Sequence, residues 1–500
     1  MKNLYNSRFL MLLALGSFLV VSCENDSIPE MEEEQVVPLT AGSANFSTFV
    51  AVGNSLTAGF TDGALFILGQ ENSMPNLVSQ KFALAGGGNF TQPYMNDNIG
   101  GALLGGVQIL NPRLFFNGAG PEVVDQMPTT EISNIMPGPY NNMGVPGAKS
   151  FHLVANGYGN IAGVPTGQAN PYFVRMASNP NASIMEDAAS LNPTFYSLWI
   201  GNNDVLSYAT SGGAGVDQTG NPDPTTYGSN DITDPGIFNV VYNSIIGTLA
   251  ANGTQGVVLN IPYVYTIPYF TTIDYNPVPL DAATAAQLNA AYALYNGGLQ
   301  QALAAGLLTQ EEVDRRTINF TEGYNPVVMI DEYLTDLSGL GLPSYRQSTE
   351  DDLIVLPAAS FIGSLVNNDP TMINGVSVPL EDNWVLSVDE VEEVTVATNA
   401  YNAIIEQAAS QNGAAFVDAN ALLQEVFESG IPFDEFELNG SLVFGGAFSL
   451  DGVHPTARGY AFVANQVLMA IDATYGSNFE AAGELFNARD FTTIYPEVIQ

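Results

Sequence analysis

From Phe46 onward, short apolar runs alternate with longer segments of helical periodicity. This alternation is typical of βα units, in which buried parallel strands are connected by helices. It predicts an α/β fold, a three-layer α/β/α domain with a flavodoxin-like parallel sheet of about five strands. Four of the strands can be assigned from apolar runs: FSTFVAVG (46–53), PTFYSLWIG (193–201), GVVLNIP (256–262) and GAAFVDA (413–419).

Capping residues predict where several helices begin and end. Ser387 followed by Glu390 forms a capping box before a long amphipathic segment, and Asp281 is a typical N-cap for the alanine-rich segment after it. Gly253 is predicted to end the helix NVVYNSIIGTLAANG, because glycine readily takes the left-handed conformation. A last helix is expected after His454.

The chain has 500 residues, which one α/β domain can hold if its loops are long. We expect this domain to span 46–475, with insertions near 86–141, 211–236 and 307–380 and a C-terminal tail at 476–500. Loops of this length usually surround a functional site. The scattered carboxylates of 211–236 are potential Ca²⁺ ligands, but they lack the spacing of an EF-hand loop. A solvated loop is therefore the favoured interpretation of this segment.

The N-terminus reads as an export signal. Lys2 and Arg8 precede the apolar run FLMLLALGSFLVVSC, which ends at Cys23, the only cysteine of the chain. Its last four residues resemble the lipobox of bacterial lipoproteins. We therefore expect a signal peptide at 1–22, lipidation of Cys23 and an acidic flexible tether at 23–45, which would place the protein in the bacterial cell envelope, at the outer membrane or cell surface. The alternative is a spare thiol in a signal that is simply cleaved or retained.

The charge balance limits the partners. The chain carries 51 acidic and 11 basic side chains, a formal net charge of −40. Such a surface repels nucleic acids, anionic polymers and anionic membranes. We expect no nucleic-acid partner, contact with a membrane only through the N-terminal lipid anchor, and a preference for neutral ester substrates.

The first predicted strand ends in an unusual corner, FVAVGNSLTAG, where Ser55 follows Gly53 and Asn54. A serine at the carboxyl end of a strand lies where open α/β sheets keep their ligands. This serine can be a nucleophile if a base removes its proton. The alternative is an ordinary turn with a helix-capping serine.

Only two histidines can serve as that base. His152 has no acidic neighbour in sequence, whereas His454 follows Asp451 by three residues, so the carboxylate can orient the imidazole. The alternative for His454 is a structural histidine that caps the final helix, with Pro455 in its first turn.

Two glycine-containing turns can supply hydrogen-bond donors for an oxyanion. Asn202 and Asn203 follow the second predicted strand, and Gly144 and Gly147 flank Val145-Pro146. Each turn taken alone can also be an ordinary loop.

Four segments together resemble the four sequence blocks of the SGNH hydrolases, also called the GDSL esterase/lipase family. They are VGNSLTAG, NMGVPGAKS, GNND and DGVH, and the resemblance runs from about Phe46 to Asp472. It implies Ser55 as nucleophile, Gly147 and Asn203 as oxyanion donors, Asp451 as acid and His454 as base.

The resemblance implies hydrolysis of carboxylic esters, carried by small molecules, lipids or acylated glycans, without a metal or an organic cofactor. One departure is Asn54, where the family usually has aspartate; asparagine keeps a carbonyl acceptor but loses the charge. The alternative function is a non-catalytic surface lipoprotein that binds a glycan or peptide through aromatic loops such as YVYTIPYFTTIDY (263–275).

Overall fold

The structure is a computed structural model that describes residues 37–499. The predicted signal peptide, Cys23 and most of the predicted tether lie outside the described residues. Contacts group Leu39–Gln500 into one compact unit. Within the described residues, no helix has both the length and the apolar character needed to cross a membrane.

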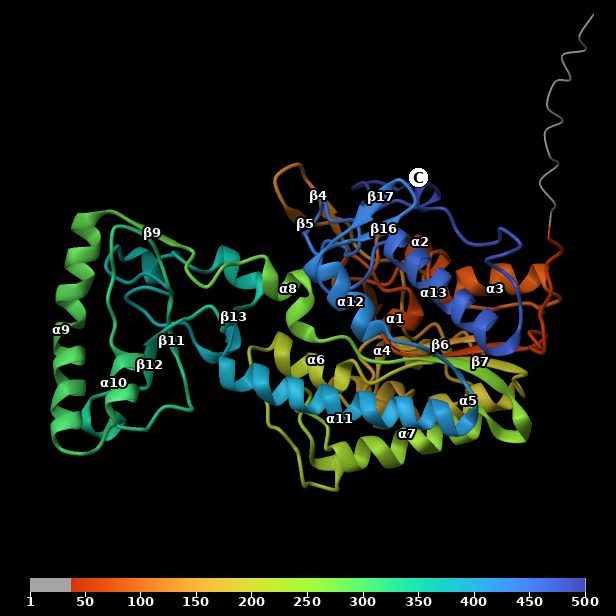
Figure 1. The fold of residues 1–500 in the computed structure, drawn as a ribbon, viewed down its shortest axis with the longest axis horizontal. Helices are drawn as coiled ribbons and strands as arrows, with labels where there is room; N and C mark the ends of the chain where they lie inside the picture. Colours follow the sequence, from red (N-terminus) through yellow and green to blue (C-terminus); the bar gives the residue numbers. More distant parts are fainter. Residues whose placement is uncertain (1–36, 500) are drawn as a thin grey trace, which may run out of the picture. The chain divides into compact units, whose positions relative to one another are not determined.

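A five-stranded parallel sheet forms the centre of this unit, in the order β15-β8-β7-β1-β6 (Figure 1). Counted along the chain, this is the order 2-1-3-4-5 of flavodoxin-like folds, so the predicted fold class is confirmed. The strands are β1 (Phe49–Gly53), β6 (Asn142–Gly144), β7 (Phe195–Trp199), β8 (Gln255–Leu259) and β15 (Ala415–Val417).

Four of these strands coincide with the predicted apolar runs, with ends that differ by at most three residues. Their residues are almost all buried, because helices cover both faces of a parallel sheet. The fifth strand, β6, was not predicted as a strand. It has only three residues, including one asparagine and one glycine, and so carries no apolar run.

Helices lie on both sides of the sheet (Figure 1). On one side α13 packs against α3, and on the other α11 packs against α7 and α6. The helices are α1 (Ser55–Ala58), α2 (Ile67–Glu71), α3 (Met74–Leu84), α4 (Pro171–Met176), α5 (Ile184–Ser190), α6 (Asn203–Thr210), α7 (Pro235–Leu249), α8 (Pro268–Thr271), α9 (Ala282–Ala304), α10 (Gln310–Arg316), α11 (Val388–Asn412), α12 (Ala419–Glu428) and α13 (Ala457–Tyr475).

Three of the four predictions about where helices begin or end are confirmed, including the last helix, α13, which begins at Ala457 soon after His454. The side chains of Ser387 and Glu390 form the predicted capping box of α11, and the Asp281 side chain caps α9. The predicted end at Gly253 is wrong. Helix α7 ends at Leu249, and a separate 3-10 turn follows in which Asn252 already takes a left-handed conformation (φ 59°).

The long insertions contain local structure of their own. Antiparallel pairs β2–β3 and β4–β5 occupy the first, whereas the second is mostly loop, in which the Asp231 carboxylate accepts hydrogen bonds from the N–H groups of Val216 and Gly228. The remaining strands are β2 (Ala102–Leu104), β3 (Val107–Leu110), β4 (Leu114–Phe116), β5 (Pro121–Val123), β9 (Val278–Leu280), β10 (Gly323–Asn325), β11 (Val328–Ile330), β12 (Tyr345–Gln347), β13 (Leu353–Ile354), β14 (Val385–Leu386), β16 (Ile431–Phe433) and β17 (Phe436–Leu438).

The third insertion begins before the predicted residue 307. Strand β9 pairs with β10 across helix α9, so the inserted structure already starts near Val278. Its interior holds Arg346, which binds the buried carboxylates of Asp331 and Asp352 at 2.5 Å each.

Segments at both ends of this unit pack onto the domain. Residues Leu39, Ala41 and Ala44, predicted to belong to the tether, lie against the hydrophobic core. In the predicted C-terminal tail, the carbonyls of Pro496 and Glu497 accept hydrogen bonds from the buried Arg113 guanidinium.

We expect Gly53→Ala to destabilise the protein by about 1–3 kcal/mol, the usual cost of overpacking. A Cβ at Gly53 would lie 2.2 Å from Thr57 Oγ1 and 2.3 Å from the carbonyl oxygen of Trp199. Urea unfolding measures the change. Gly247→Ala is the matched control, since nothing lies within 4 Å of its Cβ position in α7, and it should stabilise by about 1 kcal/mol. Equal stability of the two variants would contradict the close packing at Gly53.

Candidate active site

Three side chains form a continuous chain of hydrogen bonds at the end of β1. The distance from Ser55 Oγ to His454 Nε2 is 2.9 Å, and that from His454 Nδ1 to Asp451 Oδ2 is 2.8 Å. Ser55 is the first residue of α1, and 399 positions separate it from His454 in the chain. The fold therefore brings together the serine, histidine and aspartate that the sequence predicted to be neighbours.

Backbone pairing and a side-chain cap hold the Ser55 corner. Gly53 lies in register with Trp199 of β7 on one side and with Gly144 of β6 on the other. Asn54 caps α1, because its Oδ1 accepts a hydrogen bond from the Leu56 N–H at 3.0 Å. Its Nδ2 donates to Asn202 Oδ1 at 3.2 Å. The asparagine thus keeps the local hydrogen bonding expected at this position.

The Asp451 carboxylate is almost enclosed by donors. Its Oδ1 accepts hydrogen bonds from the N–H groups of Val453 and His454, each at 2.9 Å, and from Ser449 Oγ at 3.1 Å. The Gly63 N–H donates to Oδ2 at 2.8 Å. Burial by itself would raise the pKa of Asp451, but the His454 imidazole and the N–H groups of His454 and Val453 outweigh it and hold the pKa at about 2. Asp451 is therefore ionised at neutral pH.

The residues that support Asp451 were missed by sequence reasoning. Asp62 takes a left-handed conformation (φ 50°), and its N–H donates to Ser449 Oγ while its Oδ1 accepts from the Leu450 N–H. Burial raises the pKa of Asp62 to about 7. The only signal for this turn was the Asp-Gly pair at 62–63, which favours left-handed backbone but says nothing of its distant partner.

His454 does not cap the final helix. Thr456 caps α13, because its side chain accepts a hydrogen bond from the Gly459 N–H. The His454 ring instead packs against Phe60, with ring centroids 4.6 Å apart. The alternative interpretation of His454 as a capping residue is therefore wrong.

The predicted oxyanion donors lie at the ends of the strands on either side of β1. Asn203 begins α6, the helix that follows β7 after a short turn, and its Nδ2 donates one hydrogen bond to the Ala148 carbonyl at 3.0 Å. Gly147 follows β6 with φ 79°, a conformation that favours glycine. Among the described residues, the N–H groups of Ser55 and Gly147 donate to no acceptor.

A buried carboxylate connects these two strand ends. Asp204 accepts hydrogen bonds from the N–H and the Oγ of Ser150, at 2.8 Å and 2.7 Å. Burial raises the pKa of Asp204, and the Ser150 donors and the nearby Lys149 oppose that effect. The pairing fixes the loop that carries Gly147 relative to the helix that begins at Asn203.

His152 is held by a backbone hydrogen bond and a ring contact away from the Ser55 site. Its Nδ1 accepts a hydrogen bond from the Lys149 N–H at 3.0 Å, and its ring stacks on Tyr158 with centroids 4.4 Å apart. Burial and the Lys149 charge lower its pKa to about 4. No hydrogen bond joins His152 to Ser55 or Asp451 in the described part of the chain.

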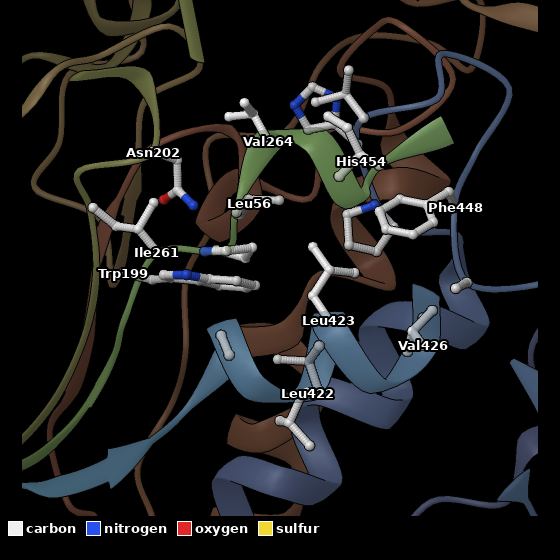
Figure 2. Close-up of a pocket in the computed structure, with 18 of the residues that line it drawn as sticks. Leu56, Trp199, Asn202, Ile261, Val264, Leu422, Leu423, Val426, Phe448 and His454 are labelled. Carbon is white, nitrogen blue, oxygen red and sulfur yellow. The ribbon is translucent and has the colours of Figure 1, made fainter. Parts of the chain in front are cut away.

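An apolar pocket with a cavity of about 120 Å³ opens beside Ser55 and His454. In Figure 2, Leu422, Leu423 and Val426 of α12 lie across it from Asn202 and His454. Most other lining side chains are aliphatic or aromatic, among them Trp199, Ile261, Val264, Phe448 and Phe462. The sequence did not predict this pocket, since its walls come from segments far apart in the chain.

The polar atoms of two lining residues are directed away from the pocket. Trp199 Nε1 donates to the Asn260 carbonyl, and Tyr263 Oη donates to Asn399 Oδ1. The pocket therefore offers polar groups mainly at Ser55, His454 and the pair Asn202 and Asn203.

Comparison with known proteins gives no match to a family model or to a curated protein. Among solved structures, a single-residue mutant of Axe2, an acetyl-xylooligosaccharide esterase from Geobacillus stearothermophilus, matches with a TM-score of 0.31 and 11% identity, over 86% of this chain and 96% of that chain. LAE5, an alpha/beta hydrolase enzyme from the metagenome of Lake Arreo, Spain, matches with a TM-score of 0.31 and 10% identity, over 86% and 97%. Similarity at this level carries no functional argument.

We expect the His152 imidazole to stay neutral until the pH falls to about 4, because burial and Lys149 oppose its protonation. Imidazole NMR signals measure this, with His152→Asn as the assignment control. The unfolded chain takes up this proton near 6.5, so stability contributed by neutral His152 is complete above that pH and is lost as the pH falls toward 4. A His152 signal that titrates near 6.5 would contradict the assignment.

Proposed function

We propose that the protein is a serine ester hydrolase of the SGNH type that cleaves carboxylic esters by two-step acyl transfer. The observation that carries the proposal is the Ser55–His454–Asp451 hydrogen-bond chain beside an apolar pocket. The four sequence blocks that resemble the SGNH family support it, because the fold brings their strand-end residues to one edge of the sheet.

In the first step, His454 Nε2 accepts the Ser55 Oγ proton while Oγ attacks the ester carbonyl. The tetrahedral intermediate collapses when His454 returns that proton to the leaving alcohol, and an acyl-serine remains. In the second step, His454 removes a proton from water while the water oxygen attacks the acyl carbonyl. The second tetrahedral intermediate collapses when His454 returns that proton to Ser55 Oγ, which releases the carboxylic acid and restores the free serine. The proposed steps use only protein groups and water.

Asp451 acts through the imidazole. As an ionised acceptor 2.8 Å from Nδ1, it keeps the Nδ1 proton in place, so that Nε2 stays free to accept the Ser55 proton. It also stabilises the positive charge that His454 carries in each tetrahedral intermediate. The donors from Gly63, Ser449, Val453 and His454 keep the carboxylate in this orientation.

The proposed oxyanion donors are the N–H groups of Ser55 and Gly147 and the second N–H of the Asn203 amide. Two observations support them. The two backbone N–H groups have no acceptor among the described residues, and Asn203 Nδ2 uses one hydrogen for Ala148. Such donors stabilise the charge that develops on the carbonyl oxygen in the transition state.

The pocket favours a neutral, apolar acyl chain as the substrate group. An engineered apolar cavity of roughly 150 Å³ holds benzene, so a cavity of about 120 Å³ next to Ser55 has room for a chain of about six carbons. The net charge of −40 also disfavours anionic substrates. We therefore propose medium-chain acyl esters as the preferred class.

A second function, binding without catalysis, receives less support. In the aromatic segment 263–275, Tyr263, Tyr265 and Tyr269 are half-buried and Phe270 is buried, so the segment does not present an exposed aromatic platform. Export and lipidation at Cys23 remain proposals from the sequence.

We expect Ser55→Ala and His454→Ala each to lower kcat by several orders of magnitude, and the double variant to lose little more, because a nucleophile and its base act as a unit. Asp451→Asn should cost less, since serine and imidazole remain. Hydrolysis of a p-nitrophenyl ester measures the effects. His152→Asn is the matched control and should keep kcat. Ester hydrolysis by Ser55→Ala at the wild-type rate would contradict the proposal.

We expect the wild type to prefer p-nitrophenyl hexanoate over the acetate in kcat/KM, and Leu422→Trp to reduce that preference by about tenfold or more, since each methylene in an apolar pocket is worth at least about that factor. Ala421→Trp places the same ring on the exposed side of α12 and should leave the preference unchanged. If both tryptophan variants behave alike, the pocket does not hold the acyl chain.

A further inference from the structure

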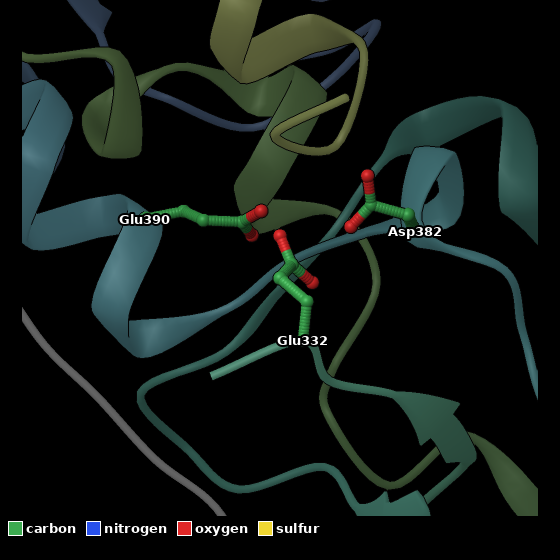
Figure 3. A group of neighbouring side chains, drawn as sticks. All are labelled: Glu332, Asp382 and Glu390. Atoms are coloured by element: carbon green, nitrogen blue, oxygen red, sulfur yellow. The ribbon is translucent and has the colours of Figure 1, made fainter. Parts of the chain in front are cut away.

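Three carboxylates converge outside the candidate active site. Glu332 follows β11, Asp382 begins the 3-10 helix η9 (Asp382–Trp384), and Glu390 lies in the first turn of α11. One oxygen from each lies within 4.8 Å of the other two, and Figure 3 shows the three side chains directed toward one another.

Backbone pairing explains why the first two meet. The Ile330 N–H donates to the Leu380 carbonyl at 2.9 Å, and the Leu380 N–H donates to the Val328 carbonyl at 2.8 Å. Glu332 and Asp382 each follow this pairing by two residues. The paired segments therefore deliver both carboxylates to the N-terminal end of α11.

Glu390 gives the independent sign of a ligand. It is fully buried (0% exposed), and its Oε2 accepts a hydrogen bond from the Ser387 N–H at 2.6 Å. Its other oxygen, Oε1, is buried and has no hydrogen-bond partner. A Cβ at Gly213 would lie 1.8 Å from Oε1, so glycine is needed there to make room for it. A buried carboxylate oxygen without a donor is costly unless a cation or a proton binds it.

No cationic side chain neutralises the cluster in the part of the chain described. The two neighbouring arginines are taken by other acids: Arg315 pairs with Asp331 and Asp389, and Arg346 with Asp331 and Asp352. Three carboxylates this close repel one another. Burial, and then the neighbouring Glu332 charge, raise the pKa of Asp382; burial is also the main cause that raises the pKa of Glu390.

We propose that Glu332, Asp382 and Glu390 bind a Ca²⁺ ion. An all-carboxylate set is the donor chemistry of hard cations, and Ca²⁺ accepts the irregular arrangement of oxygens from separate segments, whereas Mg²⁺ demands near-octahedral geometry and keeps its water. Glu332 is exposed, which leaves a route for the ion to enter.

The ion would join three segments that are distant in the chain: the end of β11, η9 and the start of α11. Its role is therefore structural. It would fasten the inserted strands to a helix that packs on the central sheet through β8 and β15. The site shares no residue with Ser55, His454 or Asp451, so it stands or falls independently of the proposed ester hydrolysis.

The test is calorimetric titration of the chelator-treated protein with Ca²⁺, together with its melting temperature in Ca²⁺ and in EDTA. We expect one ion per chain and a higher melting temperature with Ca²⁺. Glu332→Gln and Asp382→Asn should each weaken binding by about tenfold or more, because each removes a charged ligand. Glu381→Gln, the exposed acid next to Asp382, is the matched control and should bind normally.

A spectroscopic readout separates binding from folding. Trp384 lies in η9 with Asp382, so Tb³⁺ bound at the cluster should show tryptophan-sensitised emission that Ca²⁺ displaces. The proposal is overturned if the protein binds no Ca²⁺, if it binds Mg²⁺ instead, or if Glu332→Gln and Asp382→Asn bind as well as Glu381→Gln. Absence of Ca²⁺ binding would mean that shared protons relieve the repulsion.

Discussion

The parallel register of β1 between β6 and β7 is the constraint on which the site depends. Gly53 lies in register with Gly144 and Trp199, so the chain leaves three adjacent strands at the same edge of the sheet. In the order 2-1-3-4-5, the connections diverge between β1 and β7, which is where open α/β sheets hold ligands. Ser55 and Asn203 are the first residues of the helices that follow those two strands.

The sequence could predict the parts of the fold and site that depend on local pattern. Buried strands show as apolar runs, and a glycine corner marks where β1 ends, which is why Ser55 and Asn203 could be assigned. The support around Asp451 could not be predicted, because Asp62 reaches Ser449 and Leu450 across nearly the whole chain. A short sequence motif does not indicate which distant loop a carboxylate will contact in the folded protein.

Two other features were not predicted correctly, each for its own physical reason. Gly253 does take a left-handed conformation, as predicted, but Asn252 does so one residue earlier, and asparagine tolerates this conformation better than most residues. Helix α7 has already ended at Leu249, and both left-handed residues belong to the 3-10 turn that follows it. The pocket escaped prediction for a different reason. Leu422 and Val426 belong to an amphipathic helix whose sequence pattern is the same as that of any helix packed against a core. Only the tertiary fold shows that its apolar face borders Ser55.

The contrast between Asp451 and Glu390 shows how this acid-rich chain gives carboxylates different tasks. Both are largely buried, and burial alone raises the pKa of either. Asp451 receives four N–H or O–H donors and an imidazole, so it stays ionised and can orient His454. Glu390 has the Ser387 N–H at one oxygen, no partner at the other, and two further acids beside it. Donors from the protein hold the first charge. The second lacks such a set of donors, and the proposed Ca²⁺ would supply the positive charge that Arg315 and Arg346, both paired with other acids in the described part of the chain, do not.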